Sequence, residues 1–153
     1  MGCSVRIVNT SIISMTKMTI EAYLANLKAD VAKWIRADEQ VVVMLDANSD
    51  VRDGDVNQTF SALGMHEVFP EFNADLPSTS TFARNLKGVP INAILETPTV
   101  TLQAGGYLGL GKGPGLDDRC LWMDISYQTA FGYSPPPMGN VNARHLTCKD
   151  TSV

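Results

Sequence analysis

One uninterrupted apolar run that ends in acidic residues constrains this chain more than any other feature. Residues 41–45 are all apolar and three of them are valine, which is typical of a strand buried on both faces. The run ends at Asp46, and Asn48 and Asp50 follow closely. Polar side chains at the carboxyl end of such a strand often lie where α/β sheets bind ligands. They can build a divalent-metal or phosphate site, or they can simply start a turn and cap the next helix.

Charge and cysteine content narrow the class of protein. The 153 residues suit one ordinary domain, and the net charge of −4 has the wrong sign for holding nucleic acid by general electrostatics. The three cysteines, Cys3, Cys120 and Cys148, are odd in number and lack CxxC spacing, so neither a disulfide framework nor a zinc site is indicated. We therefore expect an intracellular, reducing compartment. We expect no membrane span, since no apolar run approaches the ~20 residues that a bilayer requires.

The rest of the chain predicts a mixed α/β domain over residues 1–132 and a Pro-rich, loosely ordered tail over 133–153. Apolar residues recur at helical spacing from Thr19 to Arg36, which predicts an amphipathic helix. A shorter helix is expected over 56–63, ended by Gly64. Strands are expected over 4–9, 40–46, 65–69, 89–96, 99–103 and 120–125, with loops over 70–80 and 105–115.

Three motifs, in this order along the chain, resemble the endonuclease/exonuclease/phosphatase superfamily. Residues 41–46 with Asn48 are similar to its Asp-x-Asn strand end, and residues 90–94 are similar to its Ile-Asp-Gly-Ile strand. Residues 105–124 are similar to its glycine-rich segment followed by Ser-Asp-His, in the form found in retroelement-type endonuclease domains. The resemblance covers the C-terminal half of a family domain. It implies a mixed sheet with helices on one face, as in one half of the family's four-layer α/β sandwich.

The resemblance also implies a chemistry and assigns roles to residues. Members of the family use a divalent metal, Mg²⁺ or Mn²⁺, and acidic residues to activate the water that attacks a phosphodiester. Asp46 would orient or deprotonate this water, and Asn48 would hold the water or the phosphate. Asp117 would be a metal-site or orienting carboxylate, so that Asp46 and Asp117 are the candidate metal ligands. A metal suits this chemistry because it lowers the pKa of bound water and neutralises charge in the transition state.

The chain departs from the family pattern at the residues that matter most for catalysis. Asn92 stands where the family has the Asp that orients the catalytic His, Asp118 replaces that His, and Leu116 replaces the preceding Ser. The metal-binding Glu and Asn of the family's first half have no counterpart. A carboxylate at position 118 would repel phosphate, although Asp46, Asp117 and Asp118 could regroup around one Mg²⁺. The two histidines, His66 and His145, are interpreted as ordinary surface residues.

We therefore expect a catalytically impaired domain that acts as a structural or interaction subunit. The alternative is a metal-dependent phosphodiester hydrolase, a nuclease, completed by a partner or by a second copy of the chain. Nucleic acid is an expected partner only in that alternative. The apolar side chains of residues 41–45 alternate between both faces of the sheet. One half-domain carries helices for one face only, so a protein partner or a second copy is expected to cover the other face.

Overall fold

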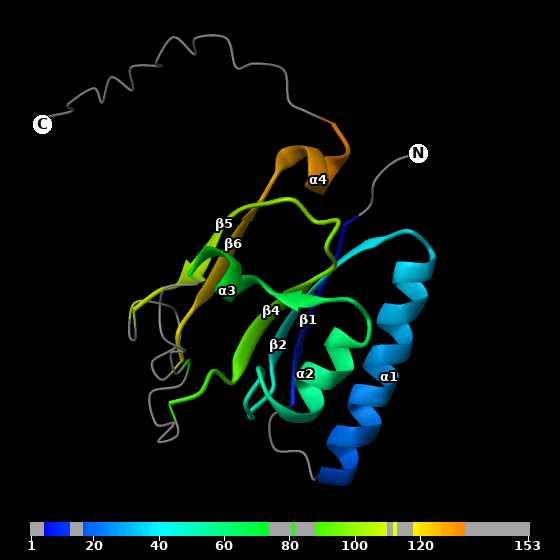
Figure 1. Cartoon of the computed structure of the whole chain (residues 1–153), viewed down its shortest axis with the longest axis vertical. Helices are drawn as coiled ribbons and strands as arrows, with labels where there is room; N and C mark the ends of the chain where they lie inside the picture. Colours follow the sequence, from blue (N-terminus) through cyan, green and yellow to red (C-terminus); the bar gives the residue numbers. More distant parts are fainter. Residues whose placement is uncertain are drawn as a thin grey trace, which may run out of the picture.

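A computed structural model describes residues 5–12, 17–73, 81, 88–109, 112 and 118–133, and every structural statement below concerns these residues. The chain is an α/β protein with a mixed four-stranded sheet and a separate two-stranded hairpin (Figure 1). The elements follow the chain in the order β1 Val5–Ser11, α1 Lys17–Arg36, β2 Gln40–Asp46, α2 Gly54–Ser61, β3 His66–Glu67, α3 Val68–Phe72, β4 Asn92–Glu96, β5 Leu102–Tyr107, β6 Leu121–Ile125 and α4 Tyr127–Phe131.

The four-stranded sheet has the strand order β1-β2-β4-β3, with β1 parallel to β2 and β4 antiparallel to both of its neighbours. The register pairs Ser11 with Asp46 and Asp46 with Asn92, so these three residues form one row at one end of the sheet. At the other end, Glu96 pairs with Val42 on one side and with His66 on the other. Because side chains alternate along a strand, Asn92 and Glu96 lie on the same face of β4.

Helices α1 and α2 cover the first face of the sheet (Figure 1). The apolar stripe of α1 is buried through Leu24, Leu27 and Val31, and α2 contributes Phe60, which is 1% exposed. These side chains pack on alternate residues of β2 and β4: Val41, Val43, Leu45, Ala93 and Leu95. The prediction of an amphipathic helix up to Arg36 is confirmed, although the helix begins at Lys17, two residues before the expected start at Thr19. Lys33 and Arg36 in its last turn interact favourably with the negative end of the helix dipole.

The second face of the sheet is covered by the chain itself. Val42 and Ile94 are buried in a second apolar cluster to which α3, β5 and β6 contribute Val68, Phe72, Leu102, Leu121, Met123 and Ile125. Val42 is 0% exposed without any other protein. The expectation that a partner must cover this face therefore loses its basis for β2 and β4. The sequence could not show this, because the hairpin that supplies the cover is far from β2 along the chain.

Two of the predicted element boundaries were wrong near Pro70. The strand expected over 65–69 is limited to His66–Glu67, and Val68–Phe72 form the helix α3 in place of a strand end and a loop. A proline in the first turn of a helix costs little, because its missing N–H would have no helical acceptor there. This helix brings Val68 to the second face of the sheet, where it joins the second cluster.

The hairpin strands also differ from the expectation. Residues 97–100 close a turn in which the Val100 N–H donates to the Thr97 carbonyl at 3.0 Å, so β5 begins at Leu102 and not at Thr99. Gly105 and Gly106, expected in a loop, lie in β5. A Cβ at Gly105 would stand 2.9 Å from Cγ1 of Val68, so glycine is what lets the strand approach α3 this closely.

The helix α4 was not expected from the sequence. Ser126 caps it by accepting a hydrogen bond from the Thr129 N–H, and Gly132 ends it in a left-handed conformation with φ 74°. Residues 110, 111 and 113–117 of the glycine-rich segment and the tail beyond 133 lie outside the described residues. Within the described residues, no helix combines the length and the apolar character needed to cross a membrane.

Candidate functional site

Asp46 lies at the end of β2 among groups that donate hydrogen bonds to it. With the Asn92 side-chain amide oriented to satisfy both of its contacts, its nitrogen donates to Asp46 Oδ1 at 3.1 Å and to the Ile91 carbonyl at 3.1 Å. The backbone N–H of Asn48 donates to the same Oδ1 at 3.3 Å, and the Ser11 hydroxyl faces Oδ2 at 3.4 Å. The structure therefore brings three of the predicted site residues together: Asp46, Asn48 and Asn92.

The turn after β2 holds Asn48 in place. Its φ of 49° is left-handed, which asparagine tolerates better than most residues. The turn is fixed against the segment just before β4 by two backbone hydrogen bonds, from Ala47 N to Ile91 O at 2.8 Å and from Val51 N to Pro90 O at 3.0 Å. Asn48 thus contacts Asp46 through its backbone, while its side chain is exposed.

Thr81 connects this end of the sheet to the segment before β6. It is 0% exposed, and its hydroxyl oxygen accepts hydrogen bonds from the backbone N–H groups of Ile91 at 2.8 Å and Asn92 at 3.1 Å. Its carbonyl accepts the N–H of Arg119 at 2.7 Å. Asp118, the half-buried residue just before Arg119, is therefore linked through Thr81 to the Asn92 end of the sheet. Asp117 lies outside the described residues, so its place in this arrangement stays a prediction.

Two contributors to this site were not singled out from the sequence. Ser11 belongs to β1, and only the parallel register with β2 brings its hydroxyl next to Asp46. Thr81 follows the loop expected over 70–80 and lies in a stretch for which the sequence predicts no element, and an isolated threonine gives no signal of a buried bridging role. In both cases the missing information is a long-range pairing, which no local pattern carries.

The chemistry available at Asp46 is limited by what surrounds it. Among the described residues, the hydrogen-bond donors that face its carboxylate are an amide, a backbone N–H and a hydroxyl, all of them neutral. Over the residues that the structure describes, Asp46 belongs to no group of three His, Cys, Asp or Glu ligand atoms close enough to hold a metal ion. The predicted Mg²⁺ or Mn²⁺ site of Asp46 and Asp117, with or without Asp118, therefore depends on Asp117.

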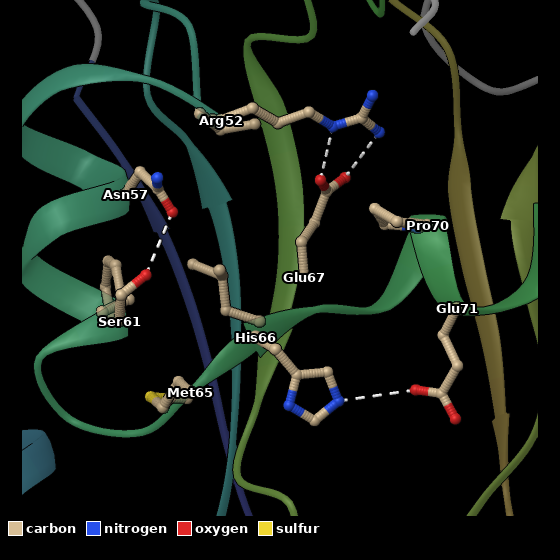
Figure 2. A pocket seen from close by; sticks show the side chains of 11 residues that line it. Arg52, Asn57, Ser61, Met65, His66, Glu67, Pro70 and Glu71 are labelled. Atoms are coloured by element: carbon tan, nitrogen blue, oxygen red, sulfur yellow. Dashed lines mark hydrogen bonds and ion pairs between the residues drawn. The ribbon is translucent and has the colours of Figure 1, made fainter. Parts of the chain in front are cut away.

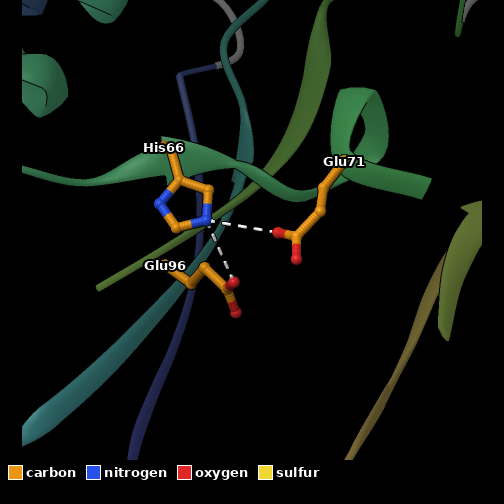
Figure 3. Close-up of side chains that lie close together, drawn as sticks. All are labelled: His66, Glu71 and Glu96. Carbon is orange, nitrogen blue, oxygen red and sulfur yellow. Dashed lines mark ion pairs between the residues drawn. The ribbon is translucent and has the colours of Figure 1, made fainter. Parts of the chain in front are cut away.

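The strand register places a second cluster of ionisable side chains at the opposite end of the same sheet face. Figure 3 shows its members, His66, Glu71 and Glu96. Nε2 of His66 lies 3.2 Å from Oε1 of Glu96 and 3.4 Å from Oε2 of Glu71. The Glu96 side chain is 2% exposed. Its burial, and to a smaller extent the charge of Glu71, raise the pKa of Glu96 to about 7. His66 does lie at the surface, as expected, but it also contacts two carboxylates.

A pocket of about 570 Å³ opens beside this cluster, between α2, β3 and α3 (Figure 2). His66 and Glu71 form part of its lining. Arg52 and Glu67 also line the pocket. The Arg52 guanidinium binds both oxygens of Glu67, at 2.6 and 3.2 Å, and the Tyr107 hydroxyl lies 3.3 Å from Glu67 Oε1. Arg52 is therefore paired within the chain and is not a free cation for an anionic ligand.

Sequence comparison identifies no relative: no model of a protein family and no curated protein sequence matches this chain.

Proposed function

We propose that this chain is a catalytically impaired domain, similar to the C-terminal half of the endonuclease/exonuclease/phosphatase fold, that acts as a structural or interaction subunit. The observation that carries the proposal is the pairing of Asn92 with Asp46, in which an amide nitrogen donates to the carboxylate. The resemblance places an aspartate at position 92 to support a histidinium. An amide carries no charge at neutral pH, so it cannot stabilise an imidazolium ion electrostatically.

An exposed group of aromatic side chains supports the interaction role. Tyr127, Phe131 and Tyr133 are 44%, 59% and 55% exposed, yet their rings pack on one another. The ring centroids of Tyr127 and Phe131 are 4.6 Å apart, and those of Tyr127 and Tyr133 are 5.4 Å apart. Exposed aromatic residues that cluster in this way are enriched at protein interfaces. We call these three residues the aromatic patch.

The alternative function is a phosphodiester hydrolase that uses Mg²⁺ or Mn²⁺ and is completed by a partner or by a second copy. Its support is the gathering of Asp46, Asn48 and Asn92 at one end of the sheet, in the order that the resemblance implies. In this alternative Asp46 and Asp117 hold the metal, and Asp118 has to be neutralised by it. The resemblance offers the candidate substrate, a phosphodiester of nucleic acid.

A nuclease assay separates the two functions. The full chain, Asp46→Ala and the control Asp55→Ala are incubated with plasmid and single-stranded DNA over a titration of Mg²⁺ and of Mn²⁺. Asp55 is a matched control because it is an exposed acidic residue in the first turn of α2. We expect all three proteins to give the same background. Turnover by the wild type and by Asp55→Ala that is lost in Asp46→Ala would overturn the proposal in favour of the hydrolase.

The interaction role is tested by light scattering and cross-linking. Phe131→Ser changes the most exposed residue of the aromatic patch. We expect the wild type to self-associate, or to form a cross-linked complex with a different protein, and we expect Phe131→Ser to lose that complex while circular dichroism stays unchanged. A wild type that is monomeric at all concentrations and gives no cross-link that depends on Phe131 would contradict this part of the proposal.

A further inference from the structure

Three side chains that share no sequence motif meet at the β3 edge of the sheet. The register pairs His66 directly with Glu96, so the two side chains lie on the same face of neighbouring strands. Glu71 follows on α3 and reaches the same imidazole nitrogen (Figure 3). One ligand atom from each residue lies within 4.8 Å of the other two. The cluster thus presents one nitrogen and two carboxylate oxygens toward a common point.

The buried member of this cluster has an unmet need for a partner. Oε2 of Glu96 is inaccessible to solvent and has no hydrogen-bond partner among the described residues. Leaving a buried polar atom unpaired costs about 1–3 kcal/mol, and more where the atom belongs to a charged group. Native structures rarely keep such an atom without a ligand, water or ion beside it. This observation is independent of the spacing of the three residues, and it points to a missing cationic ligand.

The chain's other side chains do not supply that cation within the described residues. Glu71 and Glu96 each form an ion pair with His66 and neither forms one with a lysine or an arginine there. The nearby Arg52 is committed to Glu67. Once both carboxyl groups are deprotonated, they carry two negative charges against at most one positive charge on the imidazole, which leaves an excess of negative charge at this edge of the sheet.

We propose that His66, Glu71 and Glu96 bind a divalent transition-metal ion, with Zn²⁺ and Mn²⁺ as the best-suited ions. Imidazole nitrogen favours zinc, carboxylate oxygens favour manganese, and both ions accept the mixed set. The ligand atoms around a tetrahedral zinc ion lie about 3.4 Å from one another. The three ligand atoms here lie within 4.8 Å of one another, so any two of them have to approach by at most about 1.4 Å. His66 and Glu71 are exposed and can make this movement, while the buried Glu96 stays fixed.

Three protein ligands leave a coordination position open. His66 and Glu71, but not Glu96, line the pocket between α2 and α3, and both are exposed, so a bound ion would be reached from solvent past these two side chains (Figure 2). A zinc ion with three protein ligands and one water is the arrangement that catalytic sites use, whereas structural zinc sites are closed by four. The inference concerns the other end of the sheet from Asp46 and does not rest on the function proposed above.

Metal binding is measured by calorimetry on the full chain after removal of metal with a chelator. ZnCl₂ and MnCl₂ are titrated into the wild type, His66→Ala, Glu71→Gln and Glu96→Gln. We expect one equivalent to bind to the wild type and each variant to bind at least tenfold more weakly. The controls are His145→Ala, which removes the chain's other histidine, and Glu21→Gln, which removes an exposed carboxylate from α1. Both are expected to bind as the wild type does.

Several results would overturn this inference. The wild type could fail to bind either ion saturably, or His66→Ala and Glu96→Gln could retain wild-type affinity. A loss of zinc binding in His145→Ala alone would assign the ion to a different part of the chain. Glu71→Gln keeps the test valid if a change at the buried Glu96 disturbs folding, because Glu71 is 51% exposed.

A direct readout comes from NMR of the two imidazole rings. Zinc is expected to shift the Nε2 resonance of His66, identified by its absence in His66→Ala, and to leave the ring of His145 unchanged. A shift confined to His145 would contradict the proposed ligand set. This readout does not depend on any catalytic activity, so it stays informative whether or not the chain cleaves phosphodiesters.

Discussion

Asp46 and Glu96 are carboxylates on neighbouring strands and on the same sheet face, but they lie at opposite ends and in opposite situations. Asp46 is half-buried and faces three neutral donors supplied by Ser11, Asn48 and Asn92. Glu96 is 1% exposed, and one of its oxygens has no partner among the described residues. The comparison teaches that a polar strand end can be satisfied within the chain, whereas a buried carboxylate oxygen without a donor indicates a missing ligand.

The largest expected change in stability comes from substituting the residue that lies between the two ends of β4. Ile94 lies between Asn92 and Glu96 on the second face of the sheet and is 5% exposed. Ile94→Ala should lower the free energy of unfolding by about 2–4 kcal/mol, because it removes buried methyl groups and leaves a cavity. Urea denaturation followed by circular dichroism measures this change. A loss below about 1 kcal/mol would mean that the hairpin does not form a packed second core.

Removing the Glu96 carboxylate should raise the free energy of unfolding, whereas removing the Asp46 carboxylate should lower it. The change at Glu96 should be the larger of the two. The pKa of Glu96 is raised to about 7 from an ordinary 4.5, so between these pH values the folded chain keeps a proton that the unfolded chain has released. The contribution of this group to the free energy of unfolding is fully present below pH 4.5 and is lost as the pH rises through 7. In metal-free protein at pH 8, Glu96→Gln should therefore unfold with a higher free energy than the wild type.

The expected gain for Glu96→Gln is about 1–2 kcal/mol, since one pKa unit corresponds to about 1.4 kcal/mol and solvent at this edge of the sheet screens part of the effect. Urea denaturation at pH 8 and at pH 4 measures it, and the two proteins should converge at the lower pH. Addition of zinc should reverse the order at pH 8, because the ion binds the wild type more tightly than the variant and so stabilises it more. A variant less stable than the metal-free wild type at pH 8 would show that Glu96 is satisfied without a ligand.

Asp46→Ala should have the smallest effect of the three, a loss of about 1 kcal/mol. The substitution leaves the Asn92 amide and the Asn48 N–H without their acceptor, but both groups are near enough to the surface for water to replace it. Chemical denaturation at pH 7 is the measurement. Ser11→Ala serves as the control and should change stability by less than about 0.5 kcal/mol, because its hydroxyl is exposed and 3.4 Å from Asp46. A gain in stability for Asp46→Ala would remove the contrast with Glu96.

The parts of the fold that could be predicted are those with a strong local pattern. The apolar run of β2 and the helical spacing of α1 identify both elements because burial dictates their composition. The hairpin was misjudged at Gly105, since glycine usually indicates a loop, and here it permits close packing against Val68. The sequence also failed to predict what covers the second face of the sheet, because this cover depends on contacts between segments that are distant along the chain.

The sequence predicted the residues at one end of the sheet but not those at the other end. Asp46, Asn48 and Asn92 were found by the order of their motifs, and their pairing follows from antiparallel β2 and β4. The cluster of His66, Glu71 and Glu96 could not be found, because it requires the register between a two-residue strand and a strand some thirty positions later. The one available signal was an acidic residue, Glu96, that ends an apolar strand.

The near-contact between Gly105 and Val68 has a consequence for the molecule's solubility. Adding a single methyl group there would wedge the hairpin away from α3. The apolar surface around Val42 and Ile94 would then be exposed to solvent and to other protein molecules. We therefore expect a substitution at Gly105 to cause aggregation of the protein before any binding property is lost.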